Sequence, residues 1–173
     1  MIGDRWGVSA EEVARHYPCD DLVPTPALQA WRGVTVHANR SLVWSWVTQI
    51  RLAPYSYDWV DNLGRRSPQE LRGLAEPVPG QNFTTAGGRP AGRILSVEPG
   101  VQLTGRIMGA VMSYVLVPTP GPTDESTRLL LKVAVACGRP TAPLLSVGDL
   151  VMARRQLLNL KRLAERAAEA QPR

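Results

Sequence analysis

Hydrophobic and polar residues alternate along the segment from Thr127 to Cys137. Leu129, Leu131, Val133 and Val135 occupy every second position, whereas Arg128 and Lys132 fall on positions between them. Successive side chains of a β-strand point to opposite faces, so this period of two predicts a strand with one apolar face. We expect that face to line a core and the face of Arg128 and Lys132 to meet solvent.

Four earlier segments share this period, and they lie near Gln81 to Ala86, Ala91 to Glu98, Val101 to Met108 and Val111 to Pro118. Short turns rich in Gly and Pro separate the segments, which favours antiparallel neighbours. The sequence therefore predicts a run of five antiparallel strands.

The segment from Val101 to Met108 shows which side chains such a sheet would bury. Its inward positions are Leu103, Gly105 and Ile107, and its outward positions are Gln102, Thr104 and Arg106. We expect the outward side chains to face solvent. A glycine at an inward position leaves room for a ligand or bends the sheet, and we expect Gly105 to do the latter.

Helical patterns flank the strands. After a strand from Trp31 to Ala38, capping side chains at Asn39 to Ser41 predict a short helix from about Leu42 to Ile50. The run Ser67-Pro68-Gln69-Glu70 combines an N-cap, a first-turn proline and a capping-box glutamate, and predicts a second short helix. Ser146 to Asp149 forms another capping box, which predicts a helix of roughly 30 Å from about Val147 into the 160s.

This order of elements predicts an α+β fold in which a curved antiparallel sheet wraps round a long C-terminal helix, with two short helices after the first strand. Residues 1–30 mix Trp, Tyr and Pro with acidic residues and are expected to form an arm that wraps the domain, including a short helix after Ser9. We expect one domain over residues 31–168 and a frayed tail over residues 169–173.

Four stretches carry a family resemblance, and they are residues 43–50, 55–62, 92–100 and 152–161. In these stretches the chain resembles the SRPBCC or START-like superfamily of polyketide cyclase/dehydrase and lipid-transport proteins. The resemblance spans roughly residues 30–167 and implies a helix-grip fold with a deep apolar cavity between sheet and helix. None of the four motifs is catalytic, so the resemblance implies a fold more than an activity.

The resemblance and the composition together favour a carrier or binding protein for a lipid, polyketide or isoprenoid-like molecule. Five Trp and four Tyr stand against one Phe, so most aromatic rings carry a polar group that can orient a ligand in an apolar pocket. The expected ligand-binding residues are Trp46, Tyr55, Tyr57, Trp59, Leu103, Ile107, Tyr114, Leu131, Val133 and Met152.

An enzyme is the first alternative, namely a polyketide cyclase, aromatase or dehydratase that uses the same cavity. Asp58, Tyr57 and His37 are candidates for proton transfer, although an aspartate in such a loop also commonly caps a helix or binds an arginine. No catalytic residue is assigned from the sequence.

A second alternative is an interaction module that uses the basic face of the C-terminal helix. The net charge is +5, and residues 150–173 hold six Arg and Lys against two Glu, whereas residues 1–30 are acidic. Arg155, Arg162 and Arg166 form one stripe of that helix. No aromatic residue interleaves this stripe, so we do not expect nucleic acid as a partner.

The remaining features restrict the chemistry further. Cys19 and Cys137 are far apart and only His16 and His37 are present, so we expect neither a metal site nor a cofactor. The longest nearly uncharged apolar stretch is too short to span a membrane, and no secretion signal opens the chain, so a cytoplasmic location is expected. The sequence leaves a homodimer open.

Overall fold

A computed structural model describes residues 4–119, 126–136 and 142–170. Its strands are β1 (Arg5–Trp6), β2 (Pro26–Val36), β3 (Thr84–Ala86), β4 (Arg89–Ala91), β5 (Arg93–Glu98), β6 (Gln102–Ile107), β7 (Ala110–Pro118) and β8 (Thr127–Ala136). Its helices are α1 (Ala10–Ala14), α2 (Pro18–Leu22), α3 (Arg40–Thr48), the 3-10 turn η1 (Gln49–Arg51), α4 (Asp58–Asp61) and α5 (Ala142–Glu169).

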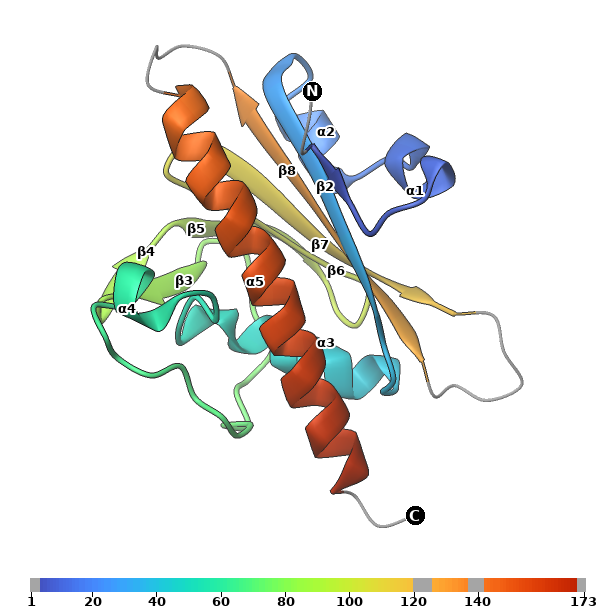
Figure 1. Cartoon of the computed structure of the whole chain (residues 1–173), viewed down its shortest axis with the longest axis vertical. Helices are drawn as coiled ribbons and strands as arrows, with labels where there is room; N and C mark the ends of the chain where they lie inside the picture. Colours follow the sequence, from blue (N-terminus) through green and yellow to red (C-terminus); the bar gives the residue numbers. More distant parts are fainter. Residues whose placement is uncertain (1–3, 120–125, 137–141, 171–173) are drawn as a thin grey trace.

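A curved six-stranded sheet in the order β1-β2-β8-β7-β6-β5 forms the centre of the molecule (Figure 1). All its pairs are antiparallel except the short parallel pair of β1 with β2. The predicted strand near residues 81–86 is not part of this sheet, because β3 pairs only with β4 in a separate hairpin. The other four predicted strands are confirmed and pair as neighbours.

The long helix α5 packs across one face of the sheet, which we call the inner face, and α3 covers the part nearer the lower end of the strands (Figure 1). Leu129, Leu131 and Val133 of β8 lie on this face with Leu157 and Leu160 of α5 in a single core. Alternation in β8 therefore predicted the buried face correctly. The arrangement is helix-grip-like, as the order of elements predicted.

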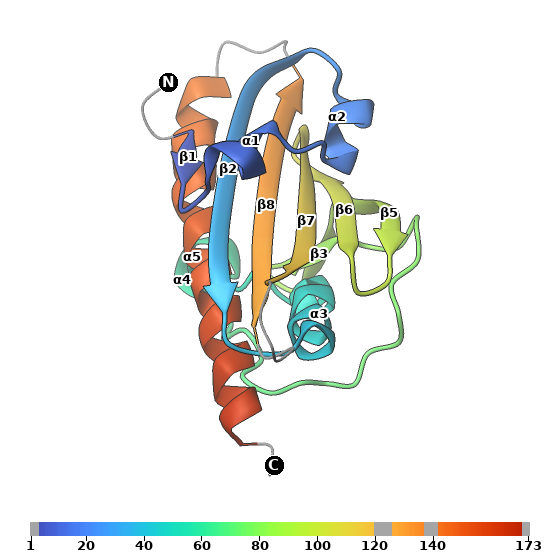
Figure 2. The same cartoon turned by 90° about the vertical axis from the view of Figure 1, so that its right-hand side faces the viewer.

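The opposite, outer face of the sheet is not exposed to solvent under the N-terminal arm. Helices α1 and α2 lie across this face, as Figure 2 shows, and Tyr17, Cys19 and Val23 form a second core there with Trp31 and neighbouring strand residues. The expectation of an outward face in water was therefore wrong at the positions that the arm covers.

Four outward side chains illustrate this correction. Lys132 is 4% exposed, and Thr104 and Gln102 are buried as well. Arg128 forms an ion pair with Glu12 of α1 at 2.6 Å. Arg106, by contrast, lies beyond the arm and is exposed as predicted. Alternation identifies the residues that share a face, but it carries no information about a segment that covers that face.

Helix starts were predicted with mixed success, because capping residues have competing partners. Ser9 and Asn39 cap α1 and α3 as expected, and Ser9 forms a complete capping box with Glu12. Ser67 starts no helix, because its hydroxyl and backbone N–H both bind the carboxylate of Asp58. The second short helix is α4 instead. Ser146 lies inside α5, which begins at Ala142.

Gly105 leaves space for a neighbouring aromatic ring rather than for a ligand or a bend. A Cβ at this position would lie 2.0 Å from Cδ2 of Phe83, far inside van der Waals contact. Phe83 thus fills the inner face of β6, and the bend expected at Gly105 is not needed to explain the glycine. Cys137 lies outside the described residues, whereas Cys19 is a buried free thiol.

Candidate functional site

The inner core meets α3, α5 and an irregular loop at one place, and the loop comprises residues 52–57. Trp46 of α3 is 2% exposed, and its ring packs edge-on against Tyr55 with centroids 6.3 Å apart and an interplanar angle of 85°. Tyr55 is also fully buried, and its φ of 57° lies in the left-handed region. A bulky residue in that region carries backbone strain of about 1–2 kcal/mol. A strained loop residue therefore occupies the interior next to Trp46.

Side-chain amides hold this loop in place. Asn159 of α5 donates to the carbonyl of Tyr55 at 2.9 Å, and Gln156 donates to the carbonyl of Pro54. Gln49 donates to the phenol oxygen of Tyr55 at 2.7 Å. Burial raises the pKa of Tyr55 to about 12, so the phenol stays protonated at neutral pH. The loop is thus fixed to α5 and η1 by a few side-chain hydrogen bonds.

The same hydrogen-bond system reaches the sheet. The Tyr114 hydroxyl donates to Oε1 of Gln156, whose amide nitrogen in turn donates to Pro54. Tyr114 lies on the inner face of β7, and Gln156 is buried against it. Sheet, helix and loop therefore share one polar chain inside an otherwise apolar core.

Two buried polar atoms beside this loop have no hydrogen-bond partner in the described structure, Nε1 of Trp46 and Oδ1 of Asp61. Leaving a buried donor or acceptor unpaired costs about 1–3 kcal/mol. The other oxygen of Asp61 accepts a hydrogen bond from Ser56, next to Tyr55. Burial raises the pKa of Asp61 above its usual range. The loop is therefore flanked by an unpaired donor and an unpaired acceptor.

The structure brings together most of the predicted ligand-binding residues in the inner core, namely Trp46, Tyr55, Leu103, Tyr114, Leu131 and Val133. Ile107 is partly buried at the edge of that core, and Met152 is half-buried on α5. Tyr57 lies half-exposed beneath the guanidinium of Arg155, which is 5.7 Å from its ring centroid. Trp59 is 77% exposed on α4 and lies outside the core.

The three candidates for proton transfer do not form one group. Both carboxylate oxygens of Asp58 accept hydrogen bonds from Ser67, at 2.5 and 2.9 Å, which is a structural role. His37 lies at the end of β2, where its ring nitrogen is 3.2 Å from Ser126 Oγ and its backbone N–H donates to Glu165. Asp61, the last residue of α4, is the carboxylate whose environment is unusual.

Two open hollows of about 380 and 390 Å³ lie on the described surface. The first is formed along α5 by Leu158, Lys161, Arg162, Glu165, Arg166 and Glu169, and the second by Arg51, Gly80, Gln81 and Asn82. Neither lies between the sheet and α5. The deep cavity implied by the resemblance therefore stays a prediction.

Two residues of the basic stripe of α5 contact other parts of the chain, since Arg155 lies 5.7 Å from the ring centroid of Tyr57 and Arg162 donates to Gln69 at 3.4 Å, whereas Arg166 is exposed. Arg154, which is not part of the stripe, lies 4.6 Å from the ring centroid of Trp6. Glu165 lies next to the stripe and pairs with Lys161. The surface is therefore mixed in charge, which gives the predicted interaction module no specific support.

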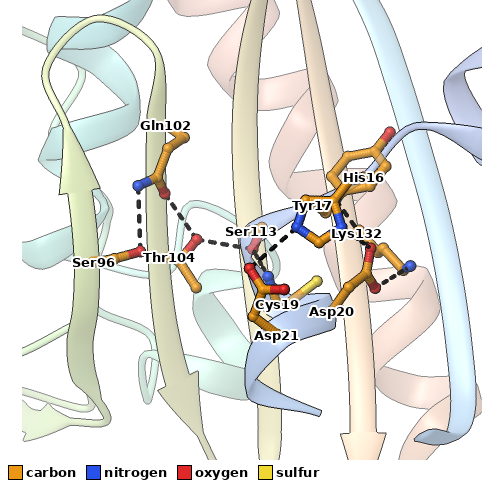
Figure 3. A network of polar contacts seen from close by, with 10 residues as sticks. All are labelled: His16, Tyr17, Cys19, Asp20, Asp21, Ser96, Gln102, Thr104, Ser113 and Lys132. Atoms are coloured by element: carbon orange, nitrogen blue, oxygen red, sulfur yellow. Dashed lines mark hydrogen bonds and ion pairs between the residues drawn. The ribbon is translucent and has the colours of Figure 1, made fainter. Parts of the chain in front are cut away.

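A second polar network lies on the outer face, where it joins the arm to the sheet (Figure 3). The Cys19 backbone N–H donates to Ser113 Oγ at 3.0 Å, and hydrogen bonds continue from Ser113 through Thr104 and Gln102 to Ser96. Lys132 pairs with Asp20 and lies 4.9 Å from the ring centroid of Trp31. Burial raises the pKa of the Cys19 thiol to about 11, so it is not a nucleophile at neutral pH. This network fixes α2 and offers no reactive group.

Within residues 4–119, 126–136 and 142–170, no three His, Cys, Asp or Glu residues are grouped closely enough to hold a metal ion. In the same ranges, no helix has both the length and the apolar content needed to cross a bilayer.

Sequence reasoning did not single out the amides that hold the loop, Gln49, Gln156 and Asn159. One signal was available for Gln156. It lies four residues before Leu160 and therefore on the apolar stripe of α5, where a polar residue needs a buried partner. The sequence contains no comparable signal for the partner itself, which is a backbone carbonyl about 100 positions away.

The sheet, the covering helix and the enclosed loop define an α+β protein of helix-grip-like arrangement. No family model matches the chain, and neither does any curated protein. Several solved structures are similar to this chain in fold. Protein MLL2253 from Mesorhizobium loti is 17% identical, with a TM-score of 0.54 over 80% of this chain and 98% of that one.

A protein from Thermobifida fusca is 20% identical, with a TM-score of 0.52 over 80% of this chain and 93% of its own. Protein NE0264 from Nitrosomonas europaea is 14% identical, with a TM-score of 0.51 over 81% and 96% of the two chains. At these identities the likeness shows a shared fold and leaves the activity to be argued from the site.

Proposed function

We propose that this protein binds an apolar small molecule, lipid, polyketide or isoprenoid-like, between the inner face of its sheet and α5, as a carrier or binding protein. The observation that carries the proposal is Tyr55. Its ring fills the interior from a strained loop position, and its loop is held there by side-chain amides rather than by a strand or helix. A ligand that replaced this ring would occupy an apolar site already lined by the core.

The inner face suits such a ligand. Its positions on β5 to β8 are apolar or aromatic except for Thr127, the first residue of β8, and they carry no charged residue. Apolar surfaces with a few polar groups are typical of small-molecule sites. Displacement of Tyr55 would also relieve its left-handed backbone, so opening the loop recovers part of its own cost.

The segment after the loop offers a route to the interior. Trp59, Val60 and Leu63 on and beside α4 are exposed, although they are large and apolar. An apolar surface next to a loop that closes an apolar core is suited to contact an apolar ligand as it enters or leaves. Loop and α4 together would then form the entrance.

A titration with 2-ethylnaphthalene, observed through the methyl groups of Leu and Val by NMR, tests the proposal. We expect saturable shifts at Leu103, Leu131 and Val133 in the inner core. The exposed Leu71 and Leu74 serve as controls within the same molecule. Shifts confined to exposed methyl groups, or none up to the solubility of the probe, would exclude the proposed site.

A pair of substitutions sharpens this test. Tyr55→Gly removes the ring and tolerates the positive φ, so we expect it to bind 2-ethylnaphthalene more tightly than the wild type does. Tyr57→Gly removes a half-exposed ring from the same loop and is expected to leave the affinity nearly unchanged. Equal effects of the two substitutions would contradict a role for Tyr55 as the displaced group.

An enzyme of the cyclase, aromatase or dehydratase type is a second candidate, and Asp61 rather than Asp58 favours it. Asp61 has one unpaired buried oxygen and a raised pKa, which are properties of a group that can exchange a proton. Carbon-13 NMR of the side-chain carboxyl carbons of Asp58 and Asp61 distinguishes the two residues. We expect Asp61 to titrate above its usual range and to shift again with bound probe, and ordinary titration in both states would remove this candidate.

A further inference from the structure

We infer that the indole N–H of Trp46 is the donor that orients the ligand, and that the ligand is an uncharged molecule with a carbonyl or similar acceptor oxygen on an apolar frame. This inference rests on the proposed function, because it names the chemistry of the same interior site. The observation behind it is that Trp46 has a fully buried donor without an acceptor.

A comparison with the neighbouring indole shows that the chain can satisfy such a donor. Trp44 lies two residues earlier on α3, and its Nε1 donates to the carboxylate of Glu76 at 2.9 Å. Trp46 points into the inner core instead, where it packs on Tyr55 and has no such partner. An acceptor brought in by a ligand would complete the hydrogen bonding of this side chain.

Trp31 also has an unpaired buried indole N–H, but its surroundings are different. It lies on the outer face beneath the arm, with the Lys132 ammonium 4.9 Å from its ring centroid. It is separated from α5 by the sheet itself. Trp46, by contrast, lies beside the residue whose ring we propose the ligand displaces.

The other polar groups near Trp46 are already engaged with one another. Gln49 donates to Tyr55 and Glu70 and accepts from the backbone N–H of Arg72. Gln156 accepts from Tyr114 and donates to Pro54. A ligand that displaces the Tyr55 ring would break the bond of Gln49 to Tyr55, and its acceptor oxygen would meet the Trp46 N–H without competition from another protein acceptor.

The charges around the site favour an uncharged ligand. The inner face of β5 to β8 carries no charged residue, and Arg32 on the inner face of β2 donates to the backbone carbonyls of Asp4 and Trp31. A carboxylate placed beside Trp46 would lose its hydration with a single neutral donor in return. A carbonyl or ether oxygen requires only that one donor.

Three naphthalene probes distinguish a neutral acceptor, no acceptor and a charged acceptor. They are 2-acetylnaphthalene, 2-ethylnaphthalene and 2-naphthoate. We expect the wild type to bind the acetyl compound about tenfold more tightly than the ethyl compound, which corresponds to one added hydrogen bond. We expect 2-naphthoate to bind more weakly than either. The indole N–H resonance of Trp46 should shift downfield with the acetyl probe only.

Trp46→Phe keeps a ring and removes the donor, so it should abolish the preference for the acetyl over the ethyl compound, measured as the ratio of the two affinities. Trp44→Phe is the matched control and should retain the preference. The indole resonance of the wild type gives the same answer if Trp46→Phe does not fold.

The outcomes distinguish this inference from the function on which it rests. Equal, saturable binding of the acetyl and ethyl probes would overturn the role of Trp46 and leave the apolar site intact. Tightest binding of 2-naphthoate would overturn the uncharged class. Absence of binding by all three probes would overturn the proposed function and this inference together.

Discussion

At the scale of single residues, the requirement for glycine at position 105 is explained by a side chain that is distant in the sequence. Its backbone conformation needs no glycine, but the ring of Phe83 occupies the place of a side chain. We expect Gly105→Ala to lower the free energy of unfolding by about 1–3 kcal/mol, as overpacking of a core does. Urea denaturation measures the change. The same substitution in a Phe83→Leu background should cost clearly less, and an equal cost would show that the clash is not with Phe83.

Asp61 leads to a prediction about pH at the same scale. Burial raises its pKa in the folded protein, so the folded state binds a proton more readily than the unfolded state does. Stability therefore falls as the pH rises from the unfolded pKa through the raised pKa, and the full penalty is present above it. We expect Asp61→Asn to melt at a higher temperature than the wild type at pH 7 and to lose this advantage near pH 3.8.

Asp58→Asn is the control for that experiment, because the carboxylate of Asp58 accepts two hydrogen bonds from Ser67. It should melt below the wild type at pH 7. If Asp61→Asn were also destabilising at every pH, the buried oxygen of Asp61 would have a partner that stabilises its charged form.

At the scale of elements, the contact of α2 with the sheet depends on an ion pair that is mostly buried. Lys132 is 5% exposed in its side chain and pairs with Asp20, whereas the neighbouring Asp21 is 72% exposed. Asp20→Asn would leave a buried ammonium without its counter-charge, and we expect a loss of about 1–3 kcal/mol in the free energy of unfolding. Asp21→Asn should change it by less than about 0.5 kcal/mol. Similar losses from both substitutions would exclude a special role for the Lys132 pair.

Helix α5 gives the second prediction at this scale. Leu157 is fully buried near the middle of the helix, so a proline there removes a hydrogen bond and disrupts its packing against the sheet. The backbone cost alone is about 3 kcal/mol or more, a large share of an ordinary domain stability. We expect Leu157→Pro to unfold the protein, as circular dichroism would report. Glu169→Pro at the last residue of α5 should remain folded, and a cooperative melt of Leu157→Pro would contradict the assigned role of the helix.

At the scale of the whole molecule, patterns within one segment were predictive and relations between segments were not. Period-two alternation identified five strands of the sheet, β2 and β5 to β8, and the inner side chains of β8, because both follow from local geometry. The same pattern could not show that residues 10–23 return to cover Thr104 and Lys132. The helix predicted to begin at Ser67 is absent for a similar reason. The Ser67 hydroxyl donates to the carboxylate of Asp58, nine residues earlier, instead of capping a helix.

The candidate site also combines features that one segment of sequence indicates with contacts that only the folded chain shows. The aromatic, irregular stretch after α3 drew attention to Tyr55, and the apolar parity of the strands drew it to Leu103 and Leu131, and all three residues lie in the inner core. The amides that hold the loop, and the unpaired N–H of Trp46, depend on which groups meet in space. Such relations follow from tertiary packing, and a single sequence contains little trace of them.

The two cores on opposite faces of one sheet give a last prediction for the molecule as a whole. The inner core contains the proposed site, whereas the outer core lies between the arm and the opposite face of the sheet, so the two can be separated experimentally. A chain that starts at Pro24 lacks α1, α2 and the short strand β1 but keeps β2 and α5. We expect it to fold with a lower urea midpoint and a smaller m-value, because it buries less surface, and to bind 2-ethylnaphthalene with the affinity of the full chain. Loss of probe binding in a folded truncated chain would instead make the arm part of the site, and an unchanged midpoint would show that the outer core contributes nothing to stability.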